Sequence, residues 1–455
     1  MGTDQFYASC VFFVRRSRKL FSKMSEPEPF LTSNRSEPVQ QNQEVDAASG
    51  VMDVTAIEVV IRNRRAQPFF GRHPWVFAGA VDHVKGAKPD QIPPGTVVRL
   101  INSEGRFIAW GLYNSNSRIV VRLYSWRPDL LLTADFWQPL IQQAIRSRRA
   151  LFQLDDSRTA CRLIFSEADG LSGLTVDLYA GYLLVQFTSL ALFQHREPIL
   201  AALQAELQPT GIWLRTEKGM REAEGLDVVD GLIAGQEPPR PLFIEEHGVS
   251  YGVDVQQGQK TGCYLDQRDN RLAASRYLKG LDVLDAFCFS GGFGITAAKL
   301  GGAASVLGID SSESALVLAK ANAELNGVAD RCRWKKDDVR PALEGMAGQG
   351  RTFDAVILDP PRMARTRGGT DRAVTGYSRL NQLAVEILKP GGILVTCSCS
   401  GLVTRAEFQE MLGEVARVTG RDIQILENRG QPSDHPVSVT CPETEYLKVM
   451  ICRVN

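Results

Sequence analysis

Residues 281–294 read LDVLDAFCFSGGFG, and this stretch decides the fold. Branched apolar residues up to Leu284 predict a buried strand, which ends at Asp285 and opens into a glycine-rich turn. A helix-like run begins at Ile295. Glycines let a ligand approach the backbone, and the N-terminus of the next helix offers unpaired N–H groups. The pattern indicates a nucleotide-like ligand, although many glycine turns bind nothing. The small residues of the turn are Ser290, Gly291 and Gly292.

Three further predicted strands end in acidic residues. Residues 304–309 precede Asp310, about 25 positions after Asp285, where an acid can accept both ribose hydroxyls. Residues 332–336 precede Asp337 and Asp338, where one carboxylate could accept a hydrogen bond from the exocyclic amine of adenine. Residues 353–358 precede Asp359, which begins an Asp-Pro-Pro-Arg element. These spacings indicate that the ligand contains a nucleoside.

Asp285, the acid at the end of the first strand, restricts the class of possible ligands further. A carboxylate at this position would repel a pyrophosphate, but it suits the positively charged end of S-adenosylmethionine. With the Asp-Pro-Pro element, the arrangement resembles the class I methyltransferase fold from about Gln256 to the C-terminus. The resemblance implies a Rossmann-like α/β domain, in which Lys260 could pair with the cofactor's carboxylate. The expected cofactor-binding residues are Lys260, Asp285, Ser290, Gly291, Gly292, Asp310, Ser311 and Asp338.

Length and composition set the broad class. A chain of 455 residues predicts two or three domains, and a hydrophobic content of 44% is enough for packed cores. No apolar run approaches about 20 residues, so we expect a soluble protein without a membrane span. The nine cysteines form no paired CxxC motifs, which favours free thiols, a reducing cytoplasmic location and no metal site.

The first residues differ in composition from the rest of the chain. Basic and aromatic residues come first, and a stretch rich in Ser, Glu, Pro, Gln and Asn follows, as is typical of disorder. We interpret residues 1–52 as disordered, or as an extension upstream of a true start at Met24 or Met52.

Residues 53–130 are predicted to form a small β domain. Short strands at 57–62, 97–101, 107–113 and 119–123 are separated by Pro and Gly, which suggests a barrel or sandwich. Residues 71–77 (GRHPWVF) resemble the opening of a PUA domain, an RNA-binding module, in which His73 and Trp75 could touch RNA or belong to the core. Basic residues exceed acidic ones here, which would attract phosphates; a solvated basic face is the alternative. The basic residues are Arg62, Arg64, Arg65, Arg72, Lys85, Lys88, Arg99, Arg106, Arg118, Arg122 and Arg127, and the acids are Glu58, Asp82, Asp90 and Glu104.

Residues 131–255 are predicted to form a central α+β domain, followed by the methyltransferase domain at 256–455. Short strands expected at 163–165, 173–178 and 183–187 resemble the central domain of the PUA-linked large-subunit ribosomal RNA methyltransferases, and among them those that form 5-methylcytosine in bacterial 23S RNA. The family's signature matches Glu245, Glu246, His247, Tyr251 and Asp254, which could tie the domains together by hydrogen bonds. The resemblance implies 23S ribosomal RNA as the partner, and a monomer or homodimer.

The fifth predicted strand, residues 392–395, continues as TCSCSG at 396–401. Cytosine C5 is a poor nucleophile, so its methylation requires a thiolate that first adds to C6. Cys397 and Cys399 share one side of an ideal strand, so spacing alone does not separate them. In RNA cytosine-5 methyltransferases the nucleophile lies in a Ser/Thr-Cys-Ser/Thr element, and this resemblance favours Cys399. A buried, inert cysteine is the alternative for either residue.

Asp359 is the second expected catalytic residue. Its carboxyl group, beside Pro360 and Pro361, could hydrogen-bond the N3 and N4 edge of a flipped cytosine. Many cytosine-5 enzymes carry a cysteine directly after the proline of this element, which helps to release the product. This chain has Pro361 and Arg362 there, so release must use another base.

Two other functions remain open from the sequence. Asp-Pro-Pro elements also cradle exocyclic nitrogens, so the chain could methylate a guanine or adenine nitrogen, with Cys399 structural. It could instead be a non-catalytic RNA-binding or ribosome-assembly factor. The intact set of strand-end acids speaks against the second alternative.

Overall fold

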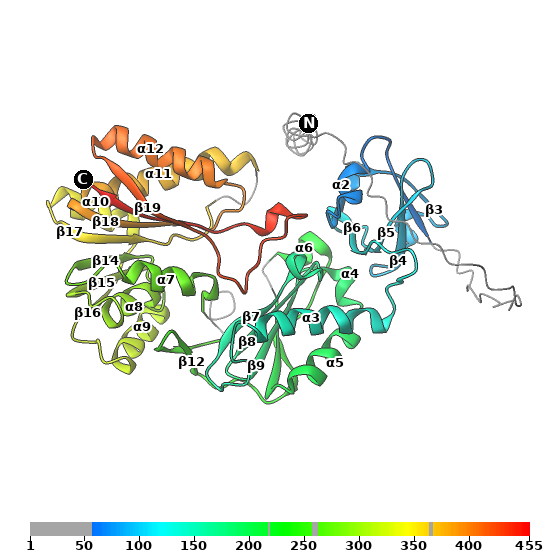
Figure 1. Cartoon of the computed structure of the whole chain (residues 1–455), viewed down its shortest axis with the longest axis horizontal. Coiled ribbons are helices and arrows are strands. Elements are labelled where there is room, and N and C mark those ends of the chain that lie inside the picture. Colours follow the sequence, from blue (N-terminus) through cyan, green and yellow to red (C-terminus); the bar gives the residue numbers. More distant parts are fainter. Residues whose placement is uncertain (1–56, 217–218, 257–262, 364–366) are drawn as a thin grey trace, which may run out of the picture. The chain divides into compact units, whose positions relative to one another are not determined.

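The computed structural model describes residues 57–216, 219–256, 263–363 and 367–455 (Figure 1). The chain divides into two units, residues 1–53 and 54–455, and all described residues belong to the second. The predicted extension at 1–52 and Lys260 therefore lie outside the described residues. No helix within these described ranges has the length and apolar character that crossing a membrane requires.

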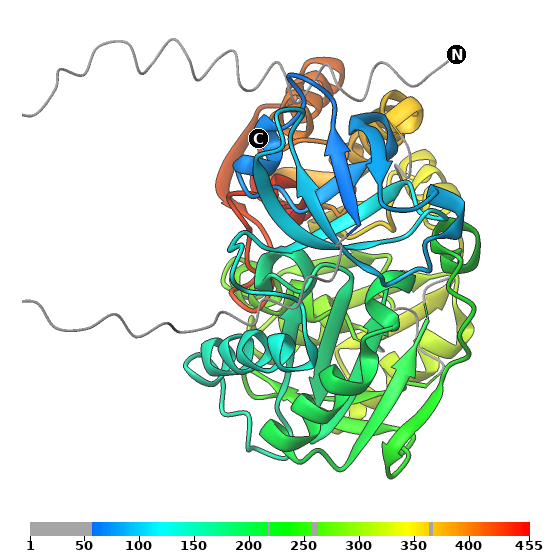
Figure 2. The same ribbon diagram turned by 90° about the vertical axis from the view of Figure 1, so that its right-hand side faces the viewer.

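The N-terminal strands form one six-stranded sheet with the order β2-β6-β5-β4-β1-β3, drawn in blue to cyan in Figure 2. All neighbours in it are antiparallel except the parallel pair β1 and β4. Four strands match the prediction, whereas β2 and β3 were missed. β2 has only three residues, and β3 reads VDHVK, an edge strand whose polar side chains hide the apolar alternation. The strands are β1 (Glu58–Ile61), β2 (Trp75–Phe77), β3 (Val81–Lys85), β4 (Val97–Ile101), β5 (Phe107–Tyr113) and β6 (Ile119–Ser125).

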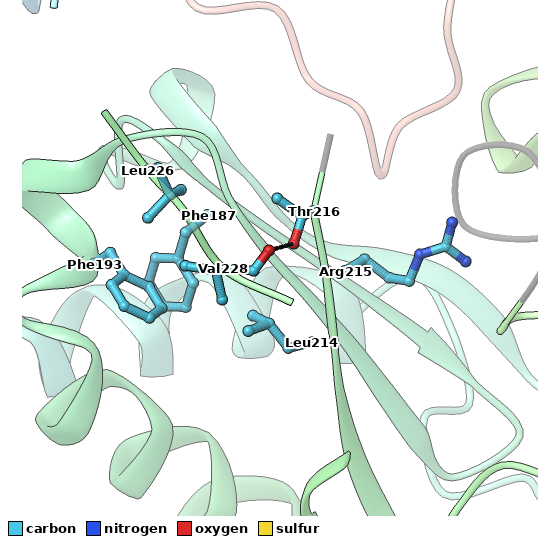
Figure 3. A pocket seen from close by; sticks show the side chains of 7 residues that line it. All are labelled: Phe187, Phe193, Leu214, Arg215, Thr216, Leu226 and Val228. Atoms are coloured by element: carbon cyan, nitrogen blue, oxygen red, sulfur yellow. Dashed lines mark hydrogen bonds between the residues drawn. The ribbon is translucent and has the colours of Figure 1, made fainter. Parts of the chain in front are cut away.

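The middle of the chain folds into a five-stranded sheet with the order β11-β10-β9-β8-β7. Its apolar side chains form one core with helices α3 (Trp137–Arg149), α4 (Leu190–Phe193) and α5 (Arg196–Leu207). A gap between side chains beside β9 and β10 is lined mainly by apolar residues and leaves no room for a water molecule (Figure 3). We interpret it as a packing gap. The strands are β7 (Ala160–Phe165), β8 (Leu174–Tyr179), β9 (Tyr182–Phe187), β10 (Gly211–Arg215) and β11 (Gly231–Gly235).

A two-stranded hairpin, β12 (Leu242–Glu246) and β13 (Val249–Val253), carries the Glu-Glu-His signature. Glu246 accepts a hydrogen bond of 2.5 Å from Arg271, and the ring of His247 lies 3.1 Å from Asp269. The hydroxyl of Tyr251 lies 2.9 Å from that of Thr296. These side chains tie the hairpin to the first two helices of the C-terminal domain.

The C-terminal domain contains a seven-stranded sheet with the order β16-β15-β14-β17-β18-β20-β19. Its first five strands are parallel, and β20 runs antiparallel to both of its neighbours. This is the doubly wound arrangement that the sequence predicts. The strands are β14 (Asp282–Ala286), β15 (Ser305–Asp310), β16 (Cys332–Lys336), β17 (Phe353–Leu358), β18 (Leu388–Ser398), β19 (Ile423–Arg429) and β20 (Lys448–Val454).

Helices cover both faces of this sheet (Figure 1). Successive residues of a strand point to opposite faces. Val283 therefore belongs to the core under α7 (Arg268–Ser275), α8 (Gly292–Lys299) and α9 (Glu313–Leu325). Leu284 belongs to the core under the other helices, which are α10 (Val339–Gly348), α11 (Thr370–Glu386) and α12 (Arg405–Thr419). Burial on both faces explains the continuous apolar runs in the sequence.

Candidate functional site

The carboxyl ends of the five parallel strands meet at one edge of the sheet. β14 lies between β15 and β17, so the strand order reverses beside it, and open α/β sheets bind ligands at such a switch point. The predicted acids and the cysteine all lie at or just beyond these strand ends. They are Asp285 on β14, Asp310 on β15, Asp338 after β16, Asp359 after β17 and Cys399 after β18.

The turn after β14 has an unusual backbone. Phe287 and Phe289 adopt left-handed conformations with φ of 66° and 49°, and Gly291 follows with φ of 83°. A left-handed conformation costs free energy in a residue other than glycine, and residues strained in this way are often found at ligand-binding sites. The N–H of Phe289 donates to Asp310 Oδ2 over 2.9 Å, which connects the turn to the end of β15.

Packing of the turn requires its glycines. A Cβ at Gly291 would lie 2.7 Å from the Trp334 ring, and one at Gly294 would lie 2.8 Å from Val306. A Cβ at Gly292 would be 3.2 Å from the Arg271 side chain. The glycine pattern therefore has a structural explanation within the protein, and evidence for a ligand must come from the acids.

Asp285 provides that evidence. Its side chain is 1% exposed, and Oδ2 accepts a 2.8 Å hydrogen bond from the N–H of Gly294. Oδ1 is buried and has no hydrogen-bond partner in the described part of the chain. Burial raises the pKa of Asp285 to about 7, and the nearby charges of Asp359 and Asp310 raise it further, against the effect of the Gly294 N–H. A cationic ligand group at Oδ1 would offset the cost of burying this carboxylate, and the ammonium of S-adenosylmethionine fits that requirement.

The acids on β15 and after β16 are more accessible. Asp310 is half-buried, and its two oxygens accept N–H bonds from Phe289 and Ser312, which leaves further lone pairs for ribose hydroxyls. Ser311 is exposed beside it. Asp338 is exposed, and its side chain does not cap α10, which it precedes.

Asp359 and Cys399 lie on neighbouring strands. β17 and β18 pair as far as Leu358, and the Sγ atom of Cys399 lies 3.9 Å from the carbonyl oxygen of Pro360. A further link joins the two loops, because the N–H of Met363 donates to Ser400 Oγ over 3.2 Å. The structure thus brings the two expected catalytic residues to one place.

The two candidate cysteines differ in exposure. Cys397 lies inside β18 with 0% of its surface exposed, and burial raises the pKa of its thiol well above the ordinary value. Cys399 follows the strand and is half-buried. Of the cysteines in the described ranges, it is the one that is not fully buried.

Sequence reasoning assigned no individual role to three residues that line this region. Gln267 is buried, and its Nε2 donates to Asp359 Oδ1 over 3.0 Å, while its Oε1 accepts from Asn270. Tyr446 donates to Asp266 over 2.7 Å. Lys448 is a buried cation in the otherwise apolar start of β20. A lysine followed by VMIC in a buried strand is a sequence signal that could have drawn attention to this position.

His73 and Trp75 make contacts within the protein. The ring of His73 lies 3.3 Å from Glu443, and the indole N–H of Trp75 donates to Glu167 over 2.8 Å. His73, Cys441 and Glu443 also bring three possible metal ligands within 4.8 Å of one another. Their mutual hydrogen bonds account for this cluster, because Nδ1 of His73 accepts from the Trp75 N–H and leaves Nε2 to donate to Glu443.

Comparisons with known proteins agree with this architecture. A PUA-like domain family matches residues 59–126, and the S-adenosylmethionine-dependent methyltransferase family matches residues 226–447. Together they account for the N-terminal sheet and the whole site edge of the C-terminal sheet.

Full-length relatives and solved structures extend the match. A protein named ribosomal RNA large subunit methyltransferase I from Shewanella denitrificans is 38% identical over 88% of this chain and 100% of its own length. Its namesake from Escherichia coli is 37% identical with the same coverage. A crystal structure described as a methyltransferase complexed with SAH has a TM-score of 0.76 at 22% identity, and covers 87% of this chain and 99% of its own. That likeness shows the fold.

Proposed function

The chain belongs to the ribosomal RNA large subunit methyltransferase I family of S-adenosylmethionine-dependent methyltransferases, and from this premise we propose that it methylates C5 of a cytosine in 23S RNA. One observation supports carbon C5, rather than a nitrogen, as the atom that is methylated. Cys399 places a half-buried thiol at a strand end beside Asp359, where a flipped base would enter. Methylation of a nitrogen needs no such thiol.

The strand-end acids are proposed to hold the cofactor. Asp285 would bind the ammonium, Asp310 with Ser311 the ribose, and Asp338 the adenine amine, with Ser290, Gly291 and Gly292 beside the tail. Lys260 is proposed for the cofactor's carboxylate. When bound, S-adenosylmethionine supplies an electrophilic methyl group.

Cys399 and Asp359 are proposed to act on the base. The thiolate of Cys399 adds to C6, and the electron pair of the C5–C6 double bond moves to C5, which then attacks an electrophile. Asp359 hydrogen-bonds the N3 and N4 edge and stabilises the covalent adduct. After C5 has lost its proton, the double bond re-forms and the thiolate leaves. The side-chain amide of Gln267 donates a 3.0 Å hydrogen bond to Asp359, so the carboxyl group is oriented before the base arrives.

The N-terminal domain is proposed to bind RNA phosphates through its exposed cations. Fewer of its basic residues are available to RNA than their number in the sequence suggests, because some are buried or paired with acids. Arg122 is buried with Glu224 at 3.1 Å, and Arg99 pairs with Glu58 at 2.9 Å. The exposed arginines include Arg62, Arg64, Arg72, Arg106 and Arg118, and phosphate contacts position a nucleic acid without reading its sequence.

Nucleoside analysis tests the proposed function. We expect 23S RNA from cells that lack the protein to lose one 5-methylcytidine, and purified protein with labelled cofactor to restore it. A missing N-methylated guanosine or adenosine would instead support the nitrogen-methylating alternative. Cofactor binding without transfer to any RNA would support an assembly role.

The raised pKa of Asp285 predicts that cofactor binding depends on pH. Below about pH 7 the buried carboxyl group keeps its proton in the cofactor-free protein and cannot attract an ammonium. Binding must then release a proton, so the Kd for S-adenosylmethionine should fall by up to about tenfold per pH unit as pH rises from 5.5 towards 7, and level off there. The same shift means that the cofactor-free protein loses stability as pH rises from about 4 to about 7, because the folded state binds the proton more tightly.

Titration calorimetry across this range measures the effect. Asp285→Asn should bind more weakly and show no pH dependence from this group. Asp330→Asn, which changes an exposed acid before β16, serves as the matched control and should keep the wild-type profile. An unchanged pH profile in Asp285→Asn would contradict this assignment.

A further inference from the structure

Lys448 is buried at the start of β20, next to the end of the strand that carries the nucleophile. It is paired with Ser398 in the ladder between β18 and β20. The side chain is less than 2% exposed, and Nζ donates to the carbonyl oxygens of Ser400 at 2.7 Å and Tyr446 at 2.9 Å. The first of these bonds fixes the backbone directly after Cys399.

A buried ammonium requires an explanation, because burial favours its neutral form. Within the described part of the chain no carboxylate forms an ion pair with Nζ, and backbone carbonyls alone give partial compensation. Burial lowers the pKa of Lys448 to about 8, so most molecules still carry the proton at pH 7. Of the neighbouring charges, the ionised thiol of Cys399 favours the protonated lysine most.

Other titratable groups surround the pair. Glu445 and Glu407 also favour the lysine cation, whereas Arg405 opposes it. Tyr446 and Tyr377 face Cys399 from the loop before β20 and from α11. Burial raises the pKa of both phenols, so they remain neutral near pH 7. The carboxyl group of Asp359 belongs to the loop after β17, whose Pro360 carbonyl oxygen lies 3.9 Å from Cys399 Sγ. Lys448 is therefore the buried cation that can offset a thiolate here.

We propose that Lys448 is a positioning residue that holds the loop of Cys399 and promotes ionisation of its thiol. The inference rests on the proposed role of Cys399 as nucleophile. Nζ lies 2.7 Å from the carbonyl oxygen of Ser400, the residue next to Cys399, and a nearby positive charge favours the ionised form of a thiol. A cationic neighbour makes a thiol reactive at neutral pH, whereas an apolar neighbourhood makes it inert.

The test measures the thiol directly and needs neither RNA nor methyl transfer. Iodoacetamide alkylation of Cys399 is followed by peptide mass spectrometry from pH 5.5 to 10, in the full-length protein without cofactor. We expect a wild-type midpoint below the ordinary value of about 8.5. In Lys448→Gln, which keeps an N–H donor for the carbonyls but removes the charge, the midpoint should rise by about one unit, and alkylation at pH 7 should slow about tenfold.

Two further variants separate charge from structure. Lys448→Arg keeps the charge and should retain a midpoint nearer to wild type than Lys448→Gln does. Lys389→Gln changes an exposed lysine at the far end of β18 and should leave the midpoint unchanged. Cofactor binding by each variant reports whether the fold is intact.

The outcomes of this experiment distinguish failure of the Lys448 proposal from failure of the proposed function. A folded Lys448→Gln protein with the wild-type midpoint would overturn it, and so would a wild-type midpoint at or above about 8.5, even if no variant folds. A lowered midpoint in a protein that methylates only nitrogen would support the effect of Lys448 on the thiol while refuting the cytosine-C5 assignment.

Discussion

Cys399→Ala is expected to lower methyl transfer to RNA by at least about a thousandfold, while cofactor affinity stays within about twofold of wild type. Without the thiolate, C5 of cytosine does not become a nucleophile, and the remaining groups of the site can only bind and orient the base. Transfer of labelled methyl groups to a 23S RNA fragment measures the loss, and calorimetry with the cofactor measures the affinity.

Cys397→Ala is the matched control for this prediction. The residue lies two positions earlier, inside β18, and is completely buried in the core under α7 and α8. Its truncation should reduce stability by leaving a small cavity, but it should preserve transfer per folded molecule. Full activity in Cys399→Ala would show that Cys399 is not a nucleophile in the reaction. Selective loss of methyl transfer in Cys397→Ala would assign the nucleophile to Cys397 instead.

Asp359→Asn is expected to reduce kcat by roughly a hundredfold to ten-thousandfold. The amide has nearly the same shape, and its oxygen can still accept the hydrogen bond from Gln267, so the loop should keep its geometry. What the variant lacks is a carboxyl group to balance charge on the cytosine edge. Single-turnover methylation with the enzyme in saturating excess over the RNA separates this loss from weaker RNA binding.

Asp354→Asn controls for the loss of a carboxylate from the same strand. Asp354 lies near the other end of β17 and pairs with Lys389 at 2.7 Å, away from the site edge. Its replacement should leave kcat unchanged. Equal activity of Asp359→Asn and wild type would exclude a role of the carboxyl group in the reaction.

The sequence predicted most of the C-terminal sheet because its strands are buried on both faces. Residues 332–336 and 353–358 were predicted with the bounds that the structure shows. The fifth strand was predicted as 392–395 but runs from Leu388 to Ser398. Pro390 and two glycines interrupt the apolar pattern at its start, where the pairing with β17 also skips from Leu388 to Ile393.

The site was predictable where strand ends define it and unpredictable where tertiary packing does. The acids that follow parallel strands must meet at one edge, so their proximity follows from strand order. Gln267 lies 92 residues from Asp359, and Lys448 lies 48 residues from Ser400. No local periodicity connects such pairs, and only the folded chain brings their atoms together.

Trapping the covalent adduct tests the central claim most directly. Wild-type protein and S-adenosylmethionine are incubated with a 23S RNA fragment that carries 5-fluorocytidine in place of cytidine. Fluorine at C5 cannot leave as a proton, so a C6 adduct that has accepted the methyl group cannot break down. We expect an RNA–protein complex that survives denaturation, with mass spectrometry placing the link on Cys399, and no complex with Cys399→Ala. Methylated RNA without a covalent complex, or a link through another residue, would contradict the account.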